Sequence, residues 1–155
     1  MRIIIPEIIT TLEAETLVKL SGPRPVGHAF GRNSIVGKVT EIISQHVSLD
    51  LSPPSYYLIY FNTSGQKPHY DGCDGPGKPN GRSWCAYSAT VLLSKGFKGG
   101  KFNFLTEPQE SFHDEMYCSL LLFSSGPNND PQRHSVDPQQ SGPARHMLLM
   151  FFKEA

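Results

Sequence analysis

Two short motifs in this sequence combine a histidine with a carboxylate at the spacing of a metal-binding pair. The first is His69-Tyr70-Asp71 and the second is His113-Asp114-Glu115. In an extended segment residues i and i+2 point to the same side, so either pair could bind one ion together. A second histidine from a distant strand would complete a set of two histidines and one carboxylate. That set leaves coordination positions open and suits non-haem Fe(II) with oxygen chemistry.

The surroundings of the two motifs favour the first one. His69 follows an apolar run that ends at Phe61 and a turn through residues 62–65. The second motif ends a polar, charged segment that begins at Glu107, and such a composition is typical of a solvated turn. We therefore expect His69 and Asp71 to be metal ligands, and His113 to lie in solvent.

Two histidines compete for the place of the distal ligand. His134 follows the apolar run CSLLLF and a polar loop, and it precedes the last apolar run of the chain. His146 lies within that last run, directly after Arg145, so these two side chains face opposite ways. A buried guanidinium beside a metal site can hold a dicarboxylate in a bidentate grip. We therefore expect Arg145 to face a cavity that contains His134, and His146 to face outward.

Two helices are predicted near the amino end. Thr10 is followed three residues later by Glu13, which is a capping-box pattern and predicts a helix over 11–20. Apolar residues at helical spacing predict a second helix over 34–47. They are Ile35, Val39, Ile42, Ile43 and Val47.

After residue 54 the sequence changes to short apolar and aromatic runs separated by turn-forming residues. The runs are SYYLIYF, CAYSATVLLS, KFNFL, MYCSLLLFSS and RHMLLMFF. Such runs without intervening helices predict a mainly β fold, an antiparallel sandwich or barrel. The segment 71–81 contains four glycines and two prolines. Its composition fits both a lid over a site and a plain surface connector.

Length and charge narrow the function classes. The 155 residues predict one domain spanning 1–155, and 14 basic residues balance 14 acidic ones, which argues against a nucleic-acid partner. No apolar run is long enough to cross a bilayer, and the amino end lacks a secretory signal, so we expect a cytoplasmic protein. Three cysteines without C-x-x-C spacing predict free thiols rather than a disulfide framework.

Several motifs in order, from Tyr56 to Phe152, resemble the iron- and 2-oxoglutarate-dependent dioxygenases of the prolyl hydroxylase superfamily. They begin with Tyr60, Gly65 and the H-x-D motif, and continue with YSATVLLSKGFKGGKFNF. They end with FSSG, His134-Ser-Val, Gly142 and Arg145. Within the superfamily the chain is similar to the leprecan-like, prolyl 3-hydroxylase-type branch, with the prolyl 4-hydroxylase-like branch as the alternative.

The resemblance implies a double-stranded β-helix (jelly-roll) core supported by amino-terminal helices. It implies that His69, Asp71 and His134 bind Fe(II), that Arg145 pairs with the distal carboxylate of 2-oxoglutarate, and that Tyr60 contacts the other end of the co-substrate. Ascorbate is a further candidate cofactor. The implied reaction is hydroxylation of a prolyl residue of a peptide or protein, with succinate and CO2 as co-products.

Other functions stay open at the level of the sequence. The substrate could be a free amino acid or another small molecule, and the chain could be a binding module that keeps the fold without the chemistry. A metal-dependent hydrolase is disfavoured, because Arg145 would have no task and no general base stands out nearby.

The sequence also departs from the pattern that it resembles. His134 and Arg145 are 11 positions apart, about one more than usual, which predicts a bulge or a longer turn between them. A tyrosine that contacts 2-oxoglutarate is common near Leu92 in the family. The nearest hydroxyls on that strand face here belong to Ser88 and Thr90.

Overall fold

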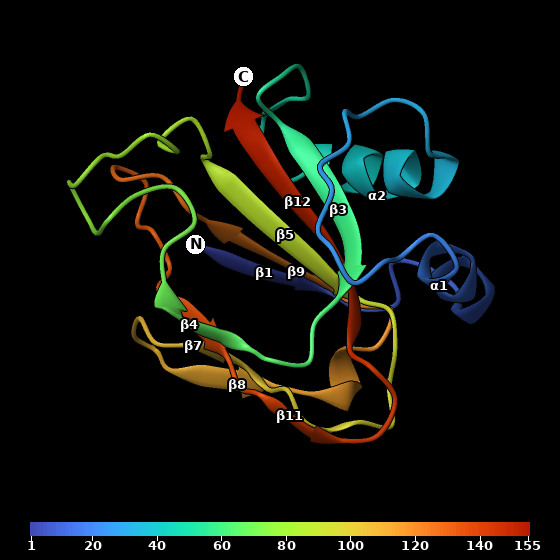
Figure 1. Cartoon of the computed structure of the whole chain (residues 1–155). Coiled ribbons are helices and arrows are strands. Elements are labelled where there is room, and N and C mark those ends of the chain that lie inside the picture. The colour runs from blue at the N-terminus through green and yellow to red at the C-terminus, as the bar shows by residue number, and fades with distance from the viewer.

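The computed structural model describes all 155 residues and consists mainly of antiparallel strands, as predicted (Figure 1). Two sheets face each other, and two helices cover the outer side of the larger one (Figure 1). This arrangement is a double-stranded β-helix, the predicted fold class. No helix is long and apolar enough to cross a membrane.

The larger sheet has six strands. They are β1 (Arg2–Ile5), β2 (Leu49–Asp50), β3 (Tyr56–Phe61), β5 (Tyr87–Leu92), β9 (Leu120–Ser124) and β12 (His146–Glu154). The order is β1–β9–β5–β12–β2, and β3 also pairs with β12. The sequence predicts β3, β5, β9 and β12. It does not predict β1, a four-residue strand whose pairing partner β9 is more than 100 residues away.

The smaller sheet has four strands in the order β4–β10–β7–β8. Their bounds are β4 (Gln66–His69), β7 (Phe102–Phe104), β8 (Glu110–Phe112) and β10 (His134–Val136). A separate ribbon pairs β6 (Lys98–Gly99) with β11 (Gln139–Ser141), and its register shifts between Gln139 and Ser141. This irregular ribbon takes up the long spacing between His134 and Arg145 that the sequence shows.

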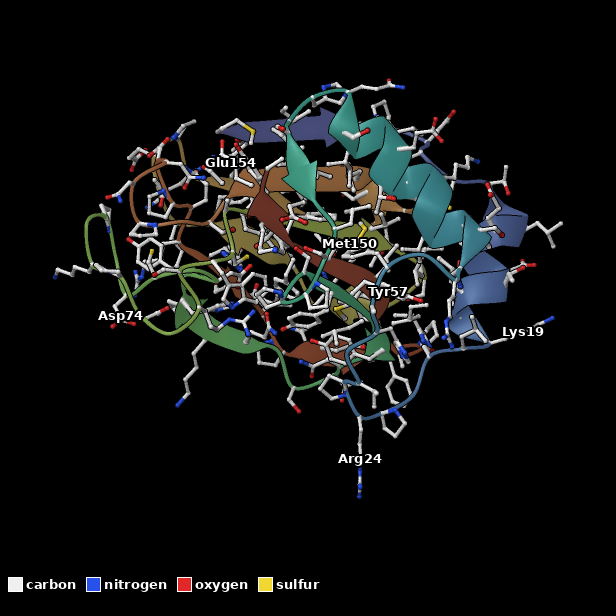
Figure 2. The ribbon with its side chains drawn as sticks, turned by 90° about the horizontal axis from the view of Figure 1, so that it is seen from above. Lys19, Arg24, Tyr57, Asp74, Met150 and Glu154 are labelled. Carbon is white, nitrogen blue, oxygen red and sulfur yellow. The ribbon has the colours of Figure 1, made fainter.

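Both predicted helices form, and both end earlier than predicted. Helix α1 spans Thr11–Val18, and its amino end carries the predicted capping box between Thr10 and Glu13. Helix α2 spans Ser34–Ser44 and is capped by the Asn33 side chain. Figure 2 shows α2 lying across the large sheet. A short 3-10 helix, Asp114–Met116, follows β8.

Alternation along the strands gives the large sheet two different faces. Leu148, Met150 and Phe152 of β12 are buried in the 18-residue apolar core beneath the helices. Met147, directly before Leu148, points to the opposite side and lines a cavity between the two sheets. The three cysteines are buried and unpaired, as predicted.

Candidate metal centre

The two distant parts of the predicted metal site meet where β4 pairs with β10. His134 lies opposite His69 in the register of these strands, and the two imidazole centroids are 4.3 Å apart. Asp71 follows two residues later, with its Oδ1 3.1 Å from His69 Nε2 and 3.3 Å from His134 Nε2. One ligand atom from each of the three residues lies within 4.8 Å of the others. The three side chains that the sequence singles out are therefore together.

Backbone carbonyls orient both imidazoles. His69 Nδ1 lies 2.7 Å from the Lys67 carbonyl oxygen, and His134 Nδ1 lies 2.9 Å from the Gln132 carbonyl oxygen. A carbonyl oxygen only accepts, so each Nδ1 carries the hydrogen and each Nε2 points toward Asp71. This outer hydrogen bond is how proteins fix the tautomer and the orientation of a metal-binding histidine.

The three side chains are sheltered to different degrees. His134 is 4% exposed, Asp71 12% and His69 33%. Burial opposes the ionisation of Asp71, but the interactions with His134 and His69 outweigh it and hold the pKa of this carboxyl well below its usual range. The hydrogen bond to Asp71 in turn raises the pKa of His69. An ionised carboxylate between two oriented imidazoles fits a non-haem Fe(II) centre.

Aromatic rings hold the buried histidine. Phe102 of β7 stacks on His134 with centroids 5.3 Å apart and an interplanar angle of 14°. Phe123 of β9 meets the same ring edge-on at 4.9 Å. His134 therefore has little freedom to turn, and the wall of the centre is apolar.

The chain after Asp71 is packed against the large sheet. A Cβ at Gly72 would lie 2.3 Å from the carbonyl oxygen of Cys85 and 2.5 Å from that of Ser125, so only glycine fits there. Arg82 donates from Nε to the Asp71 carbonyl oxygen at 3.1 Å. Within the 71–81 segment, the backbone nitrogen of Asp74 donates to the carbonyl of Lys78. These contacts hold the backbone at Asp71 and Gly72, and so fix the position from which the Asp71 side chain extends.

A cavity extends from the centre into the space between the sheets. Asp71 and His134 line one part of it and Arg145 lines another. Arg145 is 6% exposed, its Nη1 lies 3.2 Å from Met147 Sδ, and its Nε has no acceptor. Burial lowers the pKa of Arg145 to about 10, so the guanidinium is still charged at neutral pH. The cavity therefore contains a buried cation without an anionic partner.

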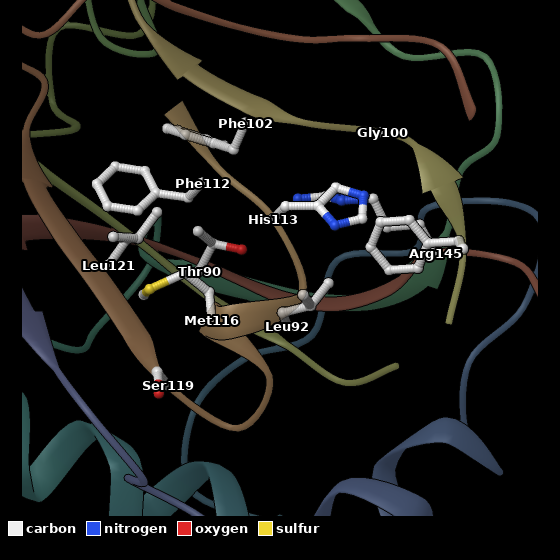
Figure 3. Close-up of a pocket in the computed structure, with 11 residues that line it drawn as sticks. Thr90, Leu92, Gly100, Phe102, Phe112, His113, Met116, Ser119, Leu121 and Arg145 are labelled. Carbon is white, nitrogen blue, oxygen red and sulfur yellow. The ribbon is translucent and has the colours of Figure 1, made fainter. Parts of the chain in front are cut away.

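The polar groups that line the cavity with Arg145 include Ser88 and Thr90, the two hydroxyls that the sequence names on that strand face. Tyr60 is 6% exposed but does not line the cavity. Its hydroxyl accepts a long 3.5 Å hydrogen bond from Gln66 Nε2, and Gln66 does line the cavity. Thr90 also lines the cavity, and its side chain points into the space next to Arg145 (Figure 3). Gln66 carries no sequence signal beyond its place three residues before His69.

The mouth of the site is built from aromatic rings and one arginine. The Arg82 guanidinium carbon lies 5.3 Å from the ring centre of Phe151, 5.5 Å from that of Trp84 and 5.8 Å from that of Tyr56. Arg82 also donates from Nη2 to the Tyr56 hydroxyl at 3.1 Å. Phe151 lines the cavity, so this cluster joins the protein surface to the centre.

The two competing histidines lie in other environments. His146 faces away from the cavity, as predicted, with its Nδ1 2.6 Å from Ser21 Oγ. The expectation that His113 is solvated is wrong. Its imidazole is 27% exposed, packs on Phe97 at 4.8 Å and lines a second cavity that Arg145 also lines (Figure 3). His113 follows directly after β8, and a polar sequence context did not reveal that position.

No protein-family model matches the chain, and no curated protein matches it by sequence. Solved structures do match its fold. A viral collagen prolyl hydroxylase from Paramecium Bursaria Chlorella virus-1, solved with 2-oxoglutarate, has a TM-score of 0.74 at 13% identity, over 99% of this chain and 96% of that one. A prolyl-4-hydroxylase from Pseudomonas putida has a TM-score of 0.70 at 14% identity, over 99% and 92%.

A third match broadens the comparison beyond prolyl hydroxylases. HygX from Streptomyces hygroscopicus, solved with nickel and 2-oxoglutarate bound, has a TM-score of 0.63 at 13% identity, over 99% of this chain and 83% of that one. These identities are low, so the likeness is one of fold. The chain has the double-stranded β-helix fold of the prolyl hydroxylase-like 2-oxoglutarate oxygenases.

Proposed function

We propose that this protein is an Fe(II)- and 2-oxoglutarate-dependent hydroxylase that acts on a prolyl residue of a peptide or protein. The observation that carries the proposal is the pairing of two features in one cavity. One is the cluster of His69, Asp71 and His134, and the other is the buried, unpartnered guanidinium of Arg145. A metal centre alone fits many reactions, whereas a metal centre with a buried cation in the same cavity fits a dicarboxylate co-substrate.

Each of these residues has a task in the proposed reaction. His69, Asp71 and His134 hold Fe(II) on one side and leave its other positions open. Arg145 binds the distal carboxylate of 2-oxoglutarate, and the Thr90 hydroxyl lies beside it. Tyr60, which the resemblance assigns to the co-substrate, reaches the cavity through the Gln66 amide.

Iron with 2-oxoglutarate and dioxygen supplies oxidative decarboxylation to succinate and CO2, coupled to the insertion of one oxygen atom into a C–H bond. The part of the protein is to position and to exclude water. Phe102 and Phe123 form an apolar wall against His134, which limits the entry of water to the centre. The Arg82 cluster at the mouth is where a peptide chain would approach.

The prolyl substrate is supported by the fold neighbours. Two of the structures described above are named as prolyl hydroxylases, and another matched structure is a prolyl hydroxylase from Trichoplax adhaerens in complex with a hypoxia inducible factor peptide. A free amino acid or another small molecule is the competing substrate class.

The test is turnover with matched peptides. The protein is incubated with Fe(II), 2-oxoglutarate and peptide pairs that carry proline or alanine at one position. We expect succinate release and a gain of one oxygen atom on the prolyl peptide only, both abolished in His69→Ala. The absence of turnover together with the absence of metal-dependent 2-oxoglutarate binding would refute the activity. Oxygen gain on alanyl peptides would refute the prolyl substrate. Parallel reactions with and without ascorbate test the ascorbate prediction.

A further inference from the structure

Arg145 also lines a second cavity (Figure 3). It has about 20 Å³ of internal free space between the sheets, which is room for roughly one water-sized group. Six of its 11 lining residues are hydrophobic. Among them are Leu92, Phe97, Phe112 and Met116. None of the three metal-site residues lines it, so it is a separate space with a different composition.

The two cavities share part of their walls. Thr90, Phe102 and Arg145 line both of them, so side chains rather than a strand separate the two spaces. No carboxylate holds the Arg145 guanidinium on either side. Its Nη1 meets only the weak acceptor Met147 Sδ, and its Nε meets none. A long side chain without an anchoring ion pair can turn from one cavity to the other.

The far wall of the second cavity is held by hydrogen bonds, and its nearest carboxylate, Asp114, lies behind His113 at 3.3 Å from the His113 Nδ1. His113 lies there with its Nε2 bonded to the Gly99 carbonyl oxygen at 2.7 Å and its ring packed on Phe97. No acidic residue lines the space, and Arg145 is its only arginine or lysine. Apolar walls with one buried cation suit an aliphatic chain that ends in a carboxylate.

We propose that the second cavity lengthens the co-substrate site, so that this protein also uses 2-oxoadipate, which is one methylene longer than 2-oxoglutarate. The inference rests on the proposed function. The extra methylene passes between Thr90 and Phe102, and Arg145 follows the carboxylate into the second cavity. The reaction balances as before: one oxygen atom of dioxygen enters the hydroxylated substrate and the other enters glutarate, formed with CO2 from 2-oxoadipate.

Binding tests the inference without depending on turnover. The Fe(II)-loaded full chain is titrated calorimetrically under argon with 2-oxoglutarate and with 2-oxoadipate. If the pocket were closed on the far side of Arg145, 2-oxoadipate would bind roughly 10–200-fold more weakly than 2-oxoglutarate because of its extra methylene. We expect the two dissociation constants to differ by less than about tenfold, and a larger penalty against 2-oxoadipate would overturn the inference.

Variants at Leu92 locate the effect. Leu92→Phe narrows the second cavity and should raise the preference for 2-oxoglutarate by about tenfold or more, whereas Leu92→Ala enlarges the cavity and should shift the preference the other way. Leu93→Phe is the matched control, because Leu93 is buried in the core beneath the helices. It should leave the ratio unchanged.

The outcomes separate the two proposals. Binding of 2-oxoglutarate alone leaves the proposed function standing and overturns this inference. Binding of neither acid to the Fe(II)-loaded chain overturns the proposed function itself. An unchanged ratio in both Leu92→Phe and Leu92→Ala also overturns the inference, and Leu92→Ala decides the matter if Leu92→Phe does not fold.

Discussion

The two faces of the large sheet carry different kinds of side chain on the same strands. On the helix side, Val91 of β5 and Leu148 of β12 lie in an apolar core of 18 buried residues. On the side of the smaller sheet, the neighbouring positions Thr90 and Met147 line a cavity together with Arg145. Because side chains alternate along a strand, a residue that stabilises the core and a residue that lines the candidate site are direct neighbours in the sequence.

This separation has an energetic consequence. The helix-facing core contains no charged group, so its burial adds directly to the stability of the fold. The inner face includes a buried cation without a partner, which costs stability that a bound anion would offset. The helix-facing side stabilises the protein without a ligand, whereas the inner face would be stabilised by the proposed anionic co-substrate.

The largest expected effect is on metal binding. Asp71→Ala removes the carboxylate that lies between His69 and His134. The Fe(II) affinity should fall by more than the roughly 10–100-fold that is typical when a residue next to a metal ligand is changed. Calorimetry with Fe(II) under argon measures it. His146→Ala is the control, because His146 faces away from the cavity. Wild-type affinity in Asp71→Ala would contradict the candidate centre.

Adjacent residues of β12 test the comparison of the two faces. Leu148→Ala empties a fully buried position in the helix-facing core and should lower the free energy of unfolding by about 2–5 kcal/mol. In the folded protein, 2-oxoglutarate affinity should be unchanged. Met147→Ala, in contrast, should lower both the stability and the affinity for 2-oxoglutarate, because Met147 contacts Arg145. Urea denaturation and calorimetry measure the two quantities, and equal losses of affinity in both variants would refute the separation.

Replacement of the buried cation should have opposite effects on stability and binding. Arg145→Met removes an unpartnered buried charge, so the metal-free protein should gain about 1–4 kcal/mol in its free energy of unfolding. The same variant should lose 2-oxoglutarate binding. Urea denaturation of the metal-free protein, beside titration of the Fe(II)-loaded protein, checks both. A loss of stability in Arg145→Met would show that the guanidinium supports the empty fold.

The smallest effect is expected far from the site. Thr10→Ala removes the capping box of α1 and should lower the free energy of unfolding by about 0.5–2 kcal/mol, with metal and co-substrate affinity unchanged. Thr16→Ala within the same helix is the control. Its hydroxyl bonds only the Leu12 carbonyl, and alanine is the better helix former, so no loss is expected. Equal losses in the two variants would exclude the cap as the cause.

The sequence was sufficient for the parts of the site that depend on local geometry. The i, i+2 spacing of His69 and Asp71 and the alternation of Arg145 with His146 follow from strand geometry alone. The choice of His134 over His146 followed from this alternation, and the pairing of β10 with β4 agrees with it. The capping box of α1 was equally local.

The parts that were missed depend on contacts between distant segments. β4 contains Pro68, which a sequence pattern reads as a break, but β4 lies at the edge of its sheet, where proline is tolerated. β1 is too short to show a pattern and forms by pairing with β9. The second cavity and the place of His113 arise from the packing of β8 and the 3-10 helix against Phe97, which no local spacing encodes.

The pairing of His69 with His134 also bears on how the chain folds. An ion shared by these two residues would join positions 65 residues apart, in the manner of a reversible cross-link, and would restrict the unfolded chain as the closure of a long loop does. The ion would also hold β4, the edge strand of the smaller sheet, to β10, its only neighbouring strand. Iron supply would then govern the lifetime of the folded protein as well as its chemistry.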